Sequence, residues 1–488
     1  DPYFTVGGTL YQFTAADCNP NMAGDQACST PIQAAIDYLA WLDATPDDNT
    51  IYVEAGTYNE DIYIESWWWT DLGDLVLSGA GSGSTIVNGG LEVYSPNSFG
   101  LSGFTFQDWV DVDAGSDVNI NDVVVDGTNA KGGLYVYSDG DVTLQGVNSY
   151  QSSYAGADVY ASGNINIKNS HFDDNTFYGL SASSYSGNVT LNGVTANGNG
   201  EAGAVANAYN GDALVTNSTF NDNGFVGLEA GFGGFGFASS PASGNLKAAV
   251  LSSSGNVTLD GVTANGNGGI GAYAFTLDGD VLIFNSTFNS NGYEGFEVEA
   301  FGGSVKLDKV TASGNSELGA YLGSDTVVEV FCSTFSNNGT GVSAGTPGLN
   351  LNGVTFFGNE VDFENQGGNV SVSDYPCGGG KDGSKDGGKK PVVLYIIIPQ
   401  TSDQMPVALA EGNTFVSALK AILTDQGAKL DDLTITLAFQ IPAGMKDAEL
   451  AVMFWNGSAW VEVSGGSVVG DAFVITVNQP GVYVLVSK

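Results

Sequence analysis

The stretch SGNVTLNGVTANGNG at residues 186–200 recurs almost unchanged as SGNVTLDGVTANGNG at residues 254–268. A second stretch, GDALVTNSTFNDNG at 211–224, recurs as GDVLIFNSTFNSNG at 279–292. Both pairs are separated by the same 68 residues, from 186 to 254 and from 211 to 279. Self-similarity at a fixed period is typical of a repeat architecture, in which each unit packs mainly on its neighbours.

Finer alignment divides the repeats into coils, each opening with a short alternating strand such as Val189-Thr-Leu191. The coils start at Val118, Val142, Ile165, Val189, Ala213, Val257, Val281, Val305, Val328 and Leu349. The starts are 21–24 residues apart, except for one interval of 44. Alternating strands and Asn/Gly turns at this spacing predict a right-handed parallel β-helix that rises about 4.8 Å per coil. The Gly- and Phe-rich insertion at about 231–253 is either an extruded loop or a degenerate coil.

Two sets of residues recur at fixed places in the coils. An asparagine follows ten residues after each start in eight coils, at Asn175, Asn199, Asn223, Asn267, Asn291, Asn315, Asn338 and Asn359. Stacked amides can hydrogen-bond along the axis, and asparagine also tolerates a left-handed bend. A core aromatic ladder alternates with alanine seven residues after the starts, at Phe172, Phe220, Phe288, Phe335 and Phe356. Alternating large and small residues suit a close-packed core, so both ladders are interpreted as structural, with a polar binding row as the alternative for the asparagines.

The composition excludes several partners. Of 488 residues 70 are glycine, and the net charge is −41 with lysine as the only basic residue type besides one histidine. This charge repels nucleic acid and anionic lipid. It keeps the protein in solution and attracts cations, so Ca²⁺ is a candidate ligand, while no other cofactor is expected.

The four cysteines form two groups, Cys18 with Cys28 and Cys332 with Cys377. An even count in two local groups predicts two disulfides and therefore an oxidising compartment. There is no apolar run long enough to span a membrane. Because the chain begins at Asp1 without methionine, we expect a secreted cell-surface protein whose signal peptide has been removed.

Composition divides the chain into four parts. Residues 1–50 hold an N-terminal strand segment and a capping helix over 30–42, for which Thr30 is the predicted N-cap. The β-helix covers 51–376, and 377–390 form a Gly/Lys/Asp linker. Residues 391–488 carry six alternating segments that predict an antiparallel β-sandwich, with one helix near 414–425.

The segments IYVEAGTYNEDIYIE at 51–65 and LVLSGAG at 75–81, following the helix, resemble the start of the pectin-lyase-like β-helix superfamily. The C-terminal elements resemble Ig-like modules of bacterial surface proteins. That superfamily includes lyases, hydrolases and esterases as well as adhesins. The arginine that its lyases and esterases use is missing, and the only histidine is His171 in Asn-Ser-His-Phe. Asp173 and Asp174 match turn residues of neighbouring coils. The chain is therefore predicted not to be an enzyme, although a carboxylate pair acting as a glycosidase needs neither histidine nor arginine.

The leading functional hypothesis is an extracellular structural scaffold or adhesin of the non-enzymatic surface-protein type. Strand addition or end-to-end stacking would build a head-to-tail homopolymer. The candidate interface residues are Tyr3, Phe4, Trp67, Trp68 and Trp69. The alternative is a secreted β-helix protein that binds or degrades a polysaccharide, and exposed tryptophans and acidic pairs favour it.

Overall fold

The computed structural model describes most of the repeat region and parts of the two ends. The described residues are 1–6, 9–14, 28–42, 49–65, 72–129, 132–231, 255–373, 375, 377, 395–400, 405, 409, 414–423, 435–441, 445, 449–469, 472–477, 479 and 481–488. Contacts divide the chain into two compact units, each described separately below. Unit 1 comprises 1–325, 334–343 and 356–363, and unit 2 comprises 326–333, 344–355 and 364–488. In the described parts of the chain no helix is long and apolar enough to cross a bilayer.

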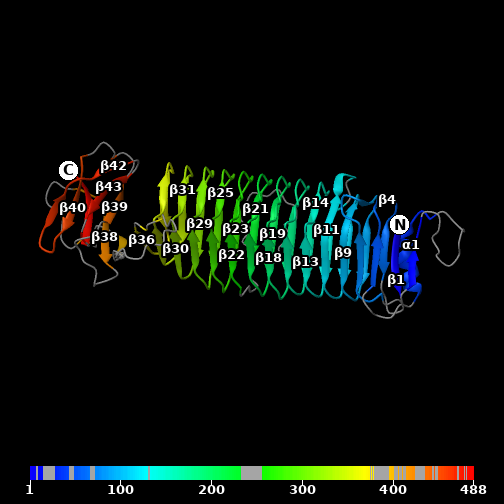
Figure 1. Ribbon diagram of the computed structural model, residues 1–488. Helices are drawn as coiled ribbons and strands as arrows, with labels where there is room; N and C mark the ends of the chain where they lie inside the picture. Colours follow the sequence, from blue (N-terminus) through cyan, green and yellow to red (C-terminus); the bar gives the residue numbers. More distant parts are fainter. Residues whose placement is uncertain are drawn as a thin grey trace, which may run out of the picture. The chain divides into compact units, whose positions relative to one another are not determined.

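Unit 1 is a parallel β-solenoid whose coils stack along one axis (Figure 1). One sheet of the solenoid contains β3 (Asn49–Val53), β6 (Leu75–Gly79), β9 (Phe99–Phe106), β11 (Val118–Asp126), β13 (Val142–Gln145), β16 (Ile165–Lys168), β18 (Val189–Asn192), β20 (Ala213–Thr216), β22 (Val257–Asp260), β24 (Val281–Phe284) and β27 (Val305–Asp308). The register pairs the predicted starts with one another, for example Val118 with Val142 and Val189 with Ala213. The predicted β-helix and its 24-residue coil are confirmed.

The second sheet has thirteen strands, all described and in parallel order along the axis. They are β5 (Ile62–Glu65), β8 (Leu91–Ser95), β10 (Val110–Ala114), β12 (Leu134–Ser138), β15 (Ala157–Ala161), β17 (Leu180–Ser184), β19 (Ala202–Ala208), β21 (Val226–Gly231), β23 (Ala272–Thr276), β26 (Phe296–Ala300), β29 (Leu318–Ser324), β32 (Thr340–Gly345) and β35 (Val361–Asn365). Alternate side chains of each strand face the core because the side-chain period of a strand is two.

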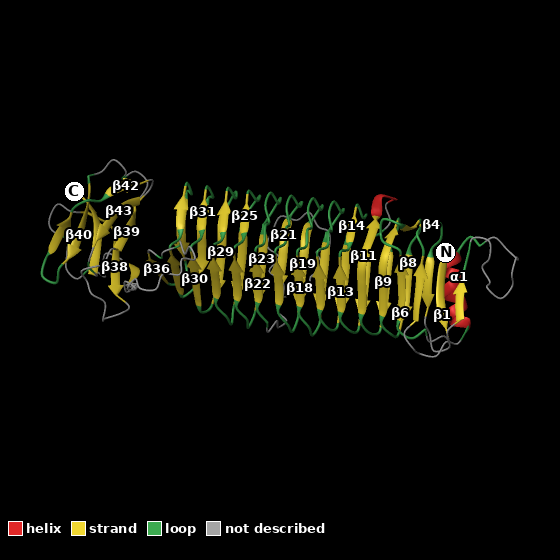
Figure 2. Cartoon of the chain, in the orientation of Figure 1, coloured by secondary structure: helices red, strands yellow, loops and turns green. Residues whose placement is uncertain are grey.

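Short strands line the third side of the coils (Figure 2). They are β4 (Gly56–Tyr58), β7 (Thr85–Val87), β14 (Asn148–Tyr150), β25 (Thr287–Asn289), β28 (Thr311–Ser313), β31 (Thr334–Ser336) and β34 (Thr355–Phe357), with a 3-10 turn η1 (Gly127–Asn129). Coils between β14 and β25 continue this side through single bridges such as His171 with Thr195.

In the described residues no coil is stacked between the strands on either side of the long interval of 44 residues. Strand β20 pairs directly with β22, and β21 pairs directly with β23. The strands on either side of the interval are therefore neighbours in both sheets. The insertion at about 231–253 lies outside the described residues, apart from its first residue, Gly231.

A cap covers the first coil. It consists of the hairpin β1 (Pro2–Val6) and β2 (Thr9–Gln12) and the helix α1 (Pro31–Trp41), which contacts β1, β3 and β5. Thr30 is the N-cap residue, as predicted, but its side chain makes no capping hydrogen bond. Glu60, from the following coil and only 5% exposed, accepts hydrogen bonds from the backbone N–H groups of Ile32 and Gln33 at 3.1 and 2.9 Å. A carboxylate is favoured at this place because helix N-termini carry unpaired N–H groups and positive dipole charge.

Unit 2 contains three parallel strands and an antiparallel part. The parallel strands are β30 (Val327–Phe331), β33 (Gly348–Asn352) and β36 (Asn369–Ser373). One antiparallel sheet contains β37 (Tyr395–Gln400), β38 (Thr414–Leu423), β44 (Gly481–Ser487), β40 (Leu450–Trp455) and β41 (Trp460–Val463), and another contains β39 (Ile435–Gln440), β43 (Ala472–Val477) and β42 (Ser467–Val469).

The helix predicted near 414–425 is wrong, because β38 is a strand hydrogen-bonded to β37 on one side and β44 on the other. Pairing on both edges overrides the helix propensity of this segment. Phe439, Val452 and Tyr483 belong to a buried core beneath the sheets. The Ig-like assignment and the four domain boundaries stay predictions, and the proposed linker 377–390 lies outside the described residues except for Cys377.

Candidate functional site

The two predicted ladders lie inside the coils. Asn175 donates from Nδ2 to Asn199 Oδ1 at 3.1 Å, and the same bond repeats at 3.0–3.1 Å through the series to Asn359. From Asn199 to Asn359, each Oδ1 also accepts the backbone N–H of the preceding ladder asparagine. The left-handed backbone falls on the residue before each asparagine, such as Asp174 or Gly198, rather than on the asparagine itself. The amides are therefore occupied with one another.

The phenylalanine ladder is equally enclosed. Phe172, Phe220, Phe288 and Phe335 have no exposed surface, and half-buried Phe356 stacks on Phe335 with ring centroids 5.8 Å apart. Their hydrophobic burial stabilises the coils by roughly 1.5–3 kcal/mol per ring. Neither ladder offers a surface to a ligand.

Of the candidate interface residues the structure describes only Tyr3 and Phe4, and their role in an interface stays a prediction. Phe4 is only 1% exposed and packs against Phe13 in the cap. Tyr3 stacks on Tyr52 with ring centroids 5.3 Å apart. The three tryptophans Trp67, Trp68 and Trp69 lie outside the described residues.

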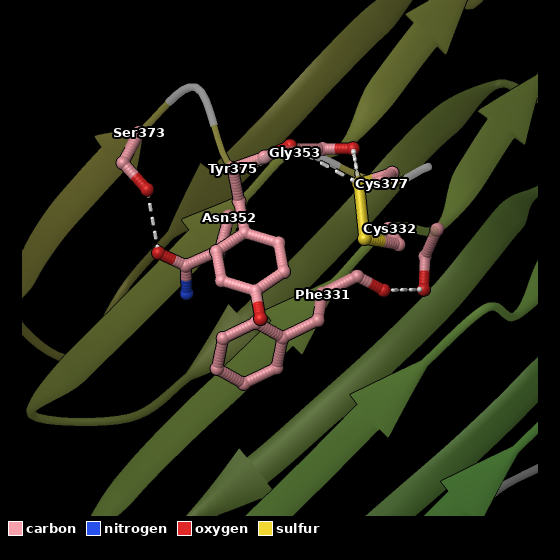
Figure 3. The surroundings of a disulfide bond; sticks show 8 residues. Phe331, Cys332, Asn352, Gly353, Ser373, Tyr375 and Cys377 are labelled. Atoms are coloured by element: carbon pink, nitrogen blue, oxygen red, sulfur yellow. Dashed lines mark hydrogen bonds between the residues drawn. A yellow bond between two sulfur atoms is a disulfide. The ribbon is translucent and has the colours of Figure 1, made fainter. Parts of the chain in front are cut away.

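Figure 3 shows the disulfide between Cys332 and Cys377, which joins two segments of unit 2. Tyr375 beside it packs edge-on against Phe331, with ring centroids 5.4 Å apart. The bond indicates an oxidising compartment, as disulfides rarely persist in the cytosol. Cys18 lies outside the described residues, so its pairing with Cys28 stays a prediction.

His171 and the neighbouring aspartates serve the turns. His171 Nδ1 lies 2.6 Å from Thr195 Oγ1 of the next coil. Asp173 Oδ1 accepts the backbone N–H of Asn197 at 2.7 Å, and Asp174 has a positive φ of 57°. These contacts fit the predicted turn role.

The functional candidate is instead the outward surface of the thirteen-stranded sheet, here called the outer face. Its first row follows outward positions that are in register on successive strands from β5 to β29 and contains Tyr63, Glu92, Asp111, Tyr135, Asp158, Ser181, Val205, Glu229, Tyr273, Glu297 and Tyr321. The second row lies two residues further along the same strands and contains Glu65, Tyr94, Asp113, Tyr137, Tyr160, Ser183, Asn207, Gly231, Phe275, Glu299 and Gly323. Carboxylates and tyrosines therefore line two stretches of the outer face in register, from β5 to β15 and from β21 to β29, with β17 and β19 between them.

The middle of the outer face holds unsatisfied polar atoms. Asn207 on β19 is 4% exposed, and its Oδ1 has no hydrogen-bond partner although its Nδ2 lies 3.4 Å from Ser183 Oγ. Oδ1 of Asp158 on β15 is also buried without a partner. Burial raises the pKa of Asp158, while hydrogen bonds from Ser181 and Tyr160 act in the opposite direction. Buried acceptors without partners are rare in folded proteins.

The carboxyl group of Glu229 on β21 has a strongly raised pKa. Burial alone raises its pKa to about 7. Its neighbour in register is Tyr273, whose hydroxyl donates to Glu299 Oε2 at 3.1 Å. Burial, and then the charge of Glu299, raise the pKa of Tyr273 as well. A carboxyl group that titrates near neutral pH can donate or accept a proton at working pH.

No group of three or more potential ligand side chains suited to a metal ion occurs in the described ranges. Ca²⁺ binding stays a prediction from the net charge.

The outer face was missed at the sequence level although a signal for it exists. The second strand of many coils reads acid or tyrosine at alternate positions, as in Tyr135-Val-Tyr137, Asp158-Val-Tyr160 and Glu297-Val-Glu299. These positions lie outside the first strands and turns, which carry the most regular repeats. Period-two alternation would have assigned them all to one exposed surface.

Comparison with known proteins supports the fold. The family model described as right-handed β-helix region matches residues 109–249. No curated protein matches the sequence. Among solved structures, the A-module of a mannuronan C-5 epimerase from Azotobacter vinelandii is 16% identical, covers 70% of this chain and 93% of that chain, and has a TM-score of 0.42. A periplasmic alginate epimerase is 11% identical, with a match over 70% of this chain and 86% of that chain and a TM-score of 0.43. The catalytic domain of a GH87 α-1,3-glucanase is 13% identical, with a match over 72% of this chain and 68% of that chain and a TM-score of 0.43. At this identity the likeness shows the fold alone.

The prediction that the chain is not an enzyme is contradicted by this comparison, since the similar solved structures are an epimerase module, a second epimerase and a glucanase. The prediction rested on the absence of arginine and on a lone histidine. Neither residue is required for acid–base chemistry, because carboxyl and phenol groups such as those of the outer face can carry it themselves.

Proposed function

We propose that this protein is a secreted β-helix protein that binds and processes a polysaccharide along the outer face. The observation that carries the proposal is that carboxylates and tyrosines occupy in-register outward positions on nine strands of one sheet, in the two groups β5 to β15 and β21 to β29, which are separated by β17 and β19. Tyrosine rings offer flat apolar surfaces with a polar tip, and carboxylates accept hydrogen bonds from hydroxyl groups. Equal spacing along the axis suits a polymer of repeating units.

The charge of the molecule selects the substrate class. The net charge is −41, and the outer face itself carries carboxylates such as Glu92, Asp111 and Asp113. Such a surface repels polyanions at ordinary ionic strength. We therefore assign a neutral polysaccharide. The disulfide Cys332–Cys377 supports a location outside the cytosol, and an extracellular one is part of the proposal.

Binding is tested by affinity electrophoresis against a panel of neutral and anionic polysaccharides. Tyr137 and Tyr160 are paired in register and exposed on the outer face. Tyr137→Ala with Tyr160→Ala is expected to weaken binding about tenfold or more, equivalent to about 1.4 kcal/mol. Phe357→Ala, an exposed aromatic on β34 away from the outer face, is the matched control and binds as wild type. Retention of only anionic polymers, or equal binding by the tyrosine variant, would overturn the proposal.

Self-association is a second proposal. The cap strand β2 is exposed, and its Leu10 is 60% exposed although apolar. An exposed strand at the start of a solenoid can pair with another copy. Electron microscopy of the purified protein tests it, with regular filaments expected and dispersed particles at all concentrations counting against it.

A further inference from the structure

The third side of the coils, formed by short strands and single bridges (Figure 2), carries two outward rows of uncharged polar side chains, here called the threonine face. The first row contains Thr195, Thr219, Thr263, Thr287, Thr311 and Thr334. The second row lies two residues further along each coil and contains Asn197, Asn221, Asn265, Asn289, Ser313 and Ser336. The residue between the rows in each coil is a buried alanine or phenylalanine, such as Ala264 or Phe288, so both rows point away from the core. All members of both rows belong to unit 1.

The two rows form a regular and rigid array. Threonines of successive coils are bridged in parallel, and Thr219 is bridged to Thr263 across the 44-residue interval. Asn221 Oδ1 accepts the backbone N–H of Asn265 at 2.9 Å, and Asn265 Oδ1 accepts that of Asn289 at 2.7 Å, which fixes the second row. Side chains therefore repeat about every 4.8 Å along the axis, and the two rows are roughly 6.6 Å apart.

Most threonine hydroxyl groups of this face are available to a ligand. Thr195, at one end of the row, is engaged, because its Oγ1 lies 2.6 Å from His171 Nδ1 and 3.4 Å from Asp173 Oδ2. Within the described residues, the hydroxyl groups of the other threonines in the row have no hydrogen-bond partner in the protein. Threonine is β-branched and stiff at χ1, so successive coils are expected to present their methyl and hydroxyl groups in the same orientation.

The absence of charge from both rows restricts what this face can bind. The net charge of the chain is −41, yet the two rows contain only threonine, asparagine and serine. Ions and charged polymers are bound through charged side chains, which these rows lack. A flat array of hydroxyl, amide and methyl groups at a constant repeat suits a neutral solid whose own hydrogen-bonding groups repeat at a constant spacing.

We propose that the threonine face binds ice, a function beyond the proposed polysaccharide binding and located on another side of the coils. Water molecules in ice lie in rows whose repeat is close to the spacing of β-strands, so successive threonines meet successive waters of one row. The hydroxyl and amide groups donate and accept hydrogen bonds, and the methyl groups order the water between them. Because the array is rigid before binding, little conformational entropy is lost on contact with the crystal. Bound protein stops growth of the ice surface that it covers.

The test measures thermal hysteresis, the gap between the melting point and the freezing point of a single ice crystal, in solutions of the full chain. The wild type is expected to show hysteresis and to be incorporated into a growing ice front. Thr263→Tyr places a large side chain in the middle of the array and is expected to lose most of the hysteresis. Thr258→Tyr, at an outward position on β22 of the first sheet, is the matched control and keeps wild-type hysteresis. Circular dichroism melts show whether each variant is folded, and Thr311→Tyr repeats the test at a second coil.

Several results would overturn the inference. They are a wild type without hysteresis that is excluded from the ice front, and folded Thr263→Tyr and Thr311→Tyr variants with unchanged hysteresis. Adsorption of the wild type to crystalline cellulose or chitin through this face, without binding to ice, would assign the array to a solid polysaccharide instead. The polysaccharide proposal is tested separately, because Tyr137→Ala with Tyr160→Ala alters the outer face and should leave hysteresis unchanged.

Discussion

Asn291 lies in the middle of the asparagine ladder, and its replacement by alanine tests whether the ladder holds the coils together. Its Oδ1 accepts the backbone N–H of Asn267 at 3.1 Å and Nδ2 of Asn267 at 3.0 Å. Its Nδ2 donates to the carbonyl of Ala264 at 3.2 Å and to Asn315 Oδ1 at 3.0 Å. The side chain is 1% exposed, so water cannot replace these partners.

The expected cost follows from the groups left without partners. Asn291→Ala leaves the backbone N–H and the side-chain amide of Asn267 without their acceptor, and it removes a donor from the carbonyl of Ala264. Each buried group left unsatisfied costs about 1–3 kcal/mol. Because the neighbouring coils relax in part, we expect a loss of about 3–5 kcal/mol in the free energy of unfolding. Asn359 is the last member of the ladder and is half-buried, so Asn359→Ala should lower the free energy of unfolding by only about 1–2 kcal/mol.

Urea denaturation followed by circular dichroism measures the loss, and native-state hydrogen exchange locates it. A solenoid is stabilised between nearest neighbours, so reduced protection should centre on the coils of Asn267, Asn291 and Asn315. Asn166→Ala, at an outward strand position on β16, is the control, with an effect within about 0.5 kcal/mol. A loss for Asn291→Ala below that for Asn359→Ala would refute the role assigned to the ladder.

Three further predictions concern other parts of the chain. Glu60→Ala removes both acceptors at the start of α1 and should cost about 2–3 kcal/mol, measured by urea denaturation against Glu65→Ala; an equal cost would contradict it. The folded pKa of Glu229 lies above its ordinary 4.5, so the native state binds more protons between pH 4.5 and 7 and stability falls as pH rises through that window. Glu229→Gln should therefore be more stable than wild type by about 2–3 kcal/mol at pH 8 and equal at pH 4, and a difference independent of pH would count against it. Replacing Cys332 and Cys377 by serine removes a disulfide that joins residues 45 positions apart in the sequence. The loss should lower the free energy of unfolding of unit 2 by about 3–4 kcal/mol, which thermal melts would measure. An unchanged melting temperature would show that the bond is dispensable.

Local pattern and tertiary context contributed differently to the terminal elements. The helix over 31–41 was predictable because its apolar residues share one face, yet its cap comes from Glu60, which is distant in sequence. The segment 414–423 carries helix-forming residues, but two strands pair with it on either edge. Neither outcome is visible in a short window, since it depends on which segments meet in space.

The sequence by itself determined the solenoid, the coil starts and the identity of the ladder residues. Each coil repeats against its neighbour, so one period in the chain becomes one translation in space, and register follows from counting. Only the tertiary structure decided where function is expected. Carboxylates and tyrosines that are neighbours in register on adjacent strands of the outer face lie 19 or more residues apart along the chain, and Glu229 and Tyr273 become neighbours only because the strands on either side of the insertion pair directly. Their ionisation depends on burial and on side chains from other coils, which sequence distance does not measure.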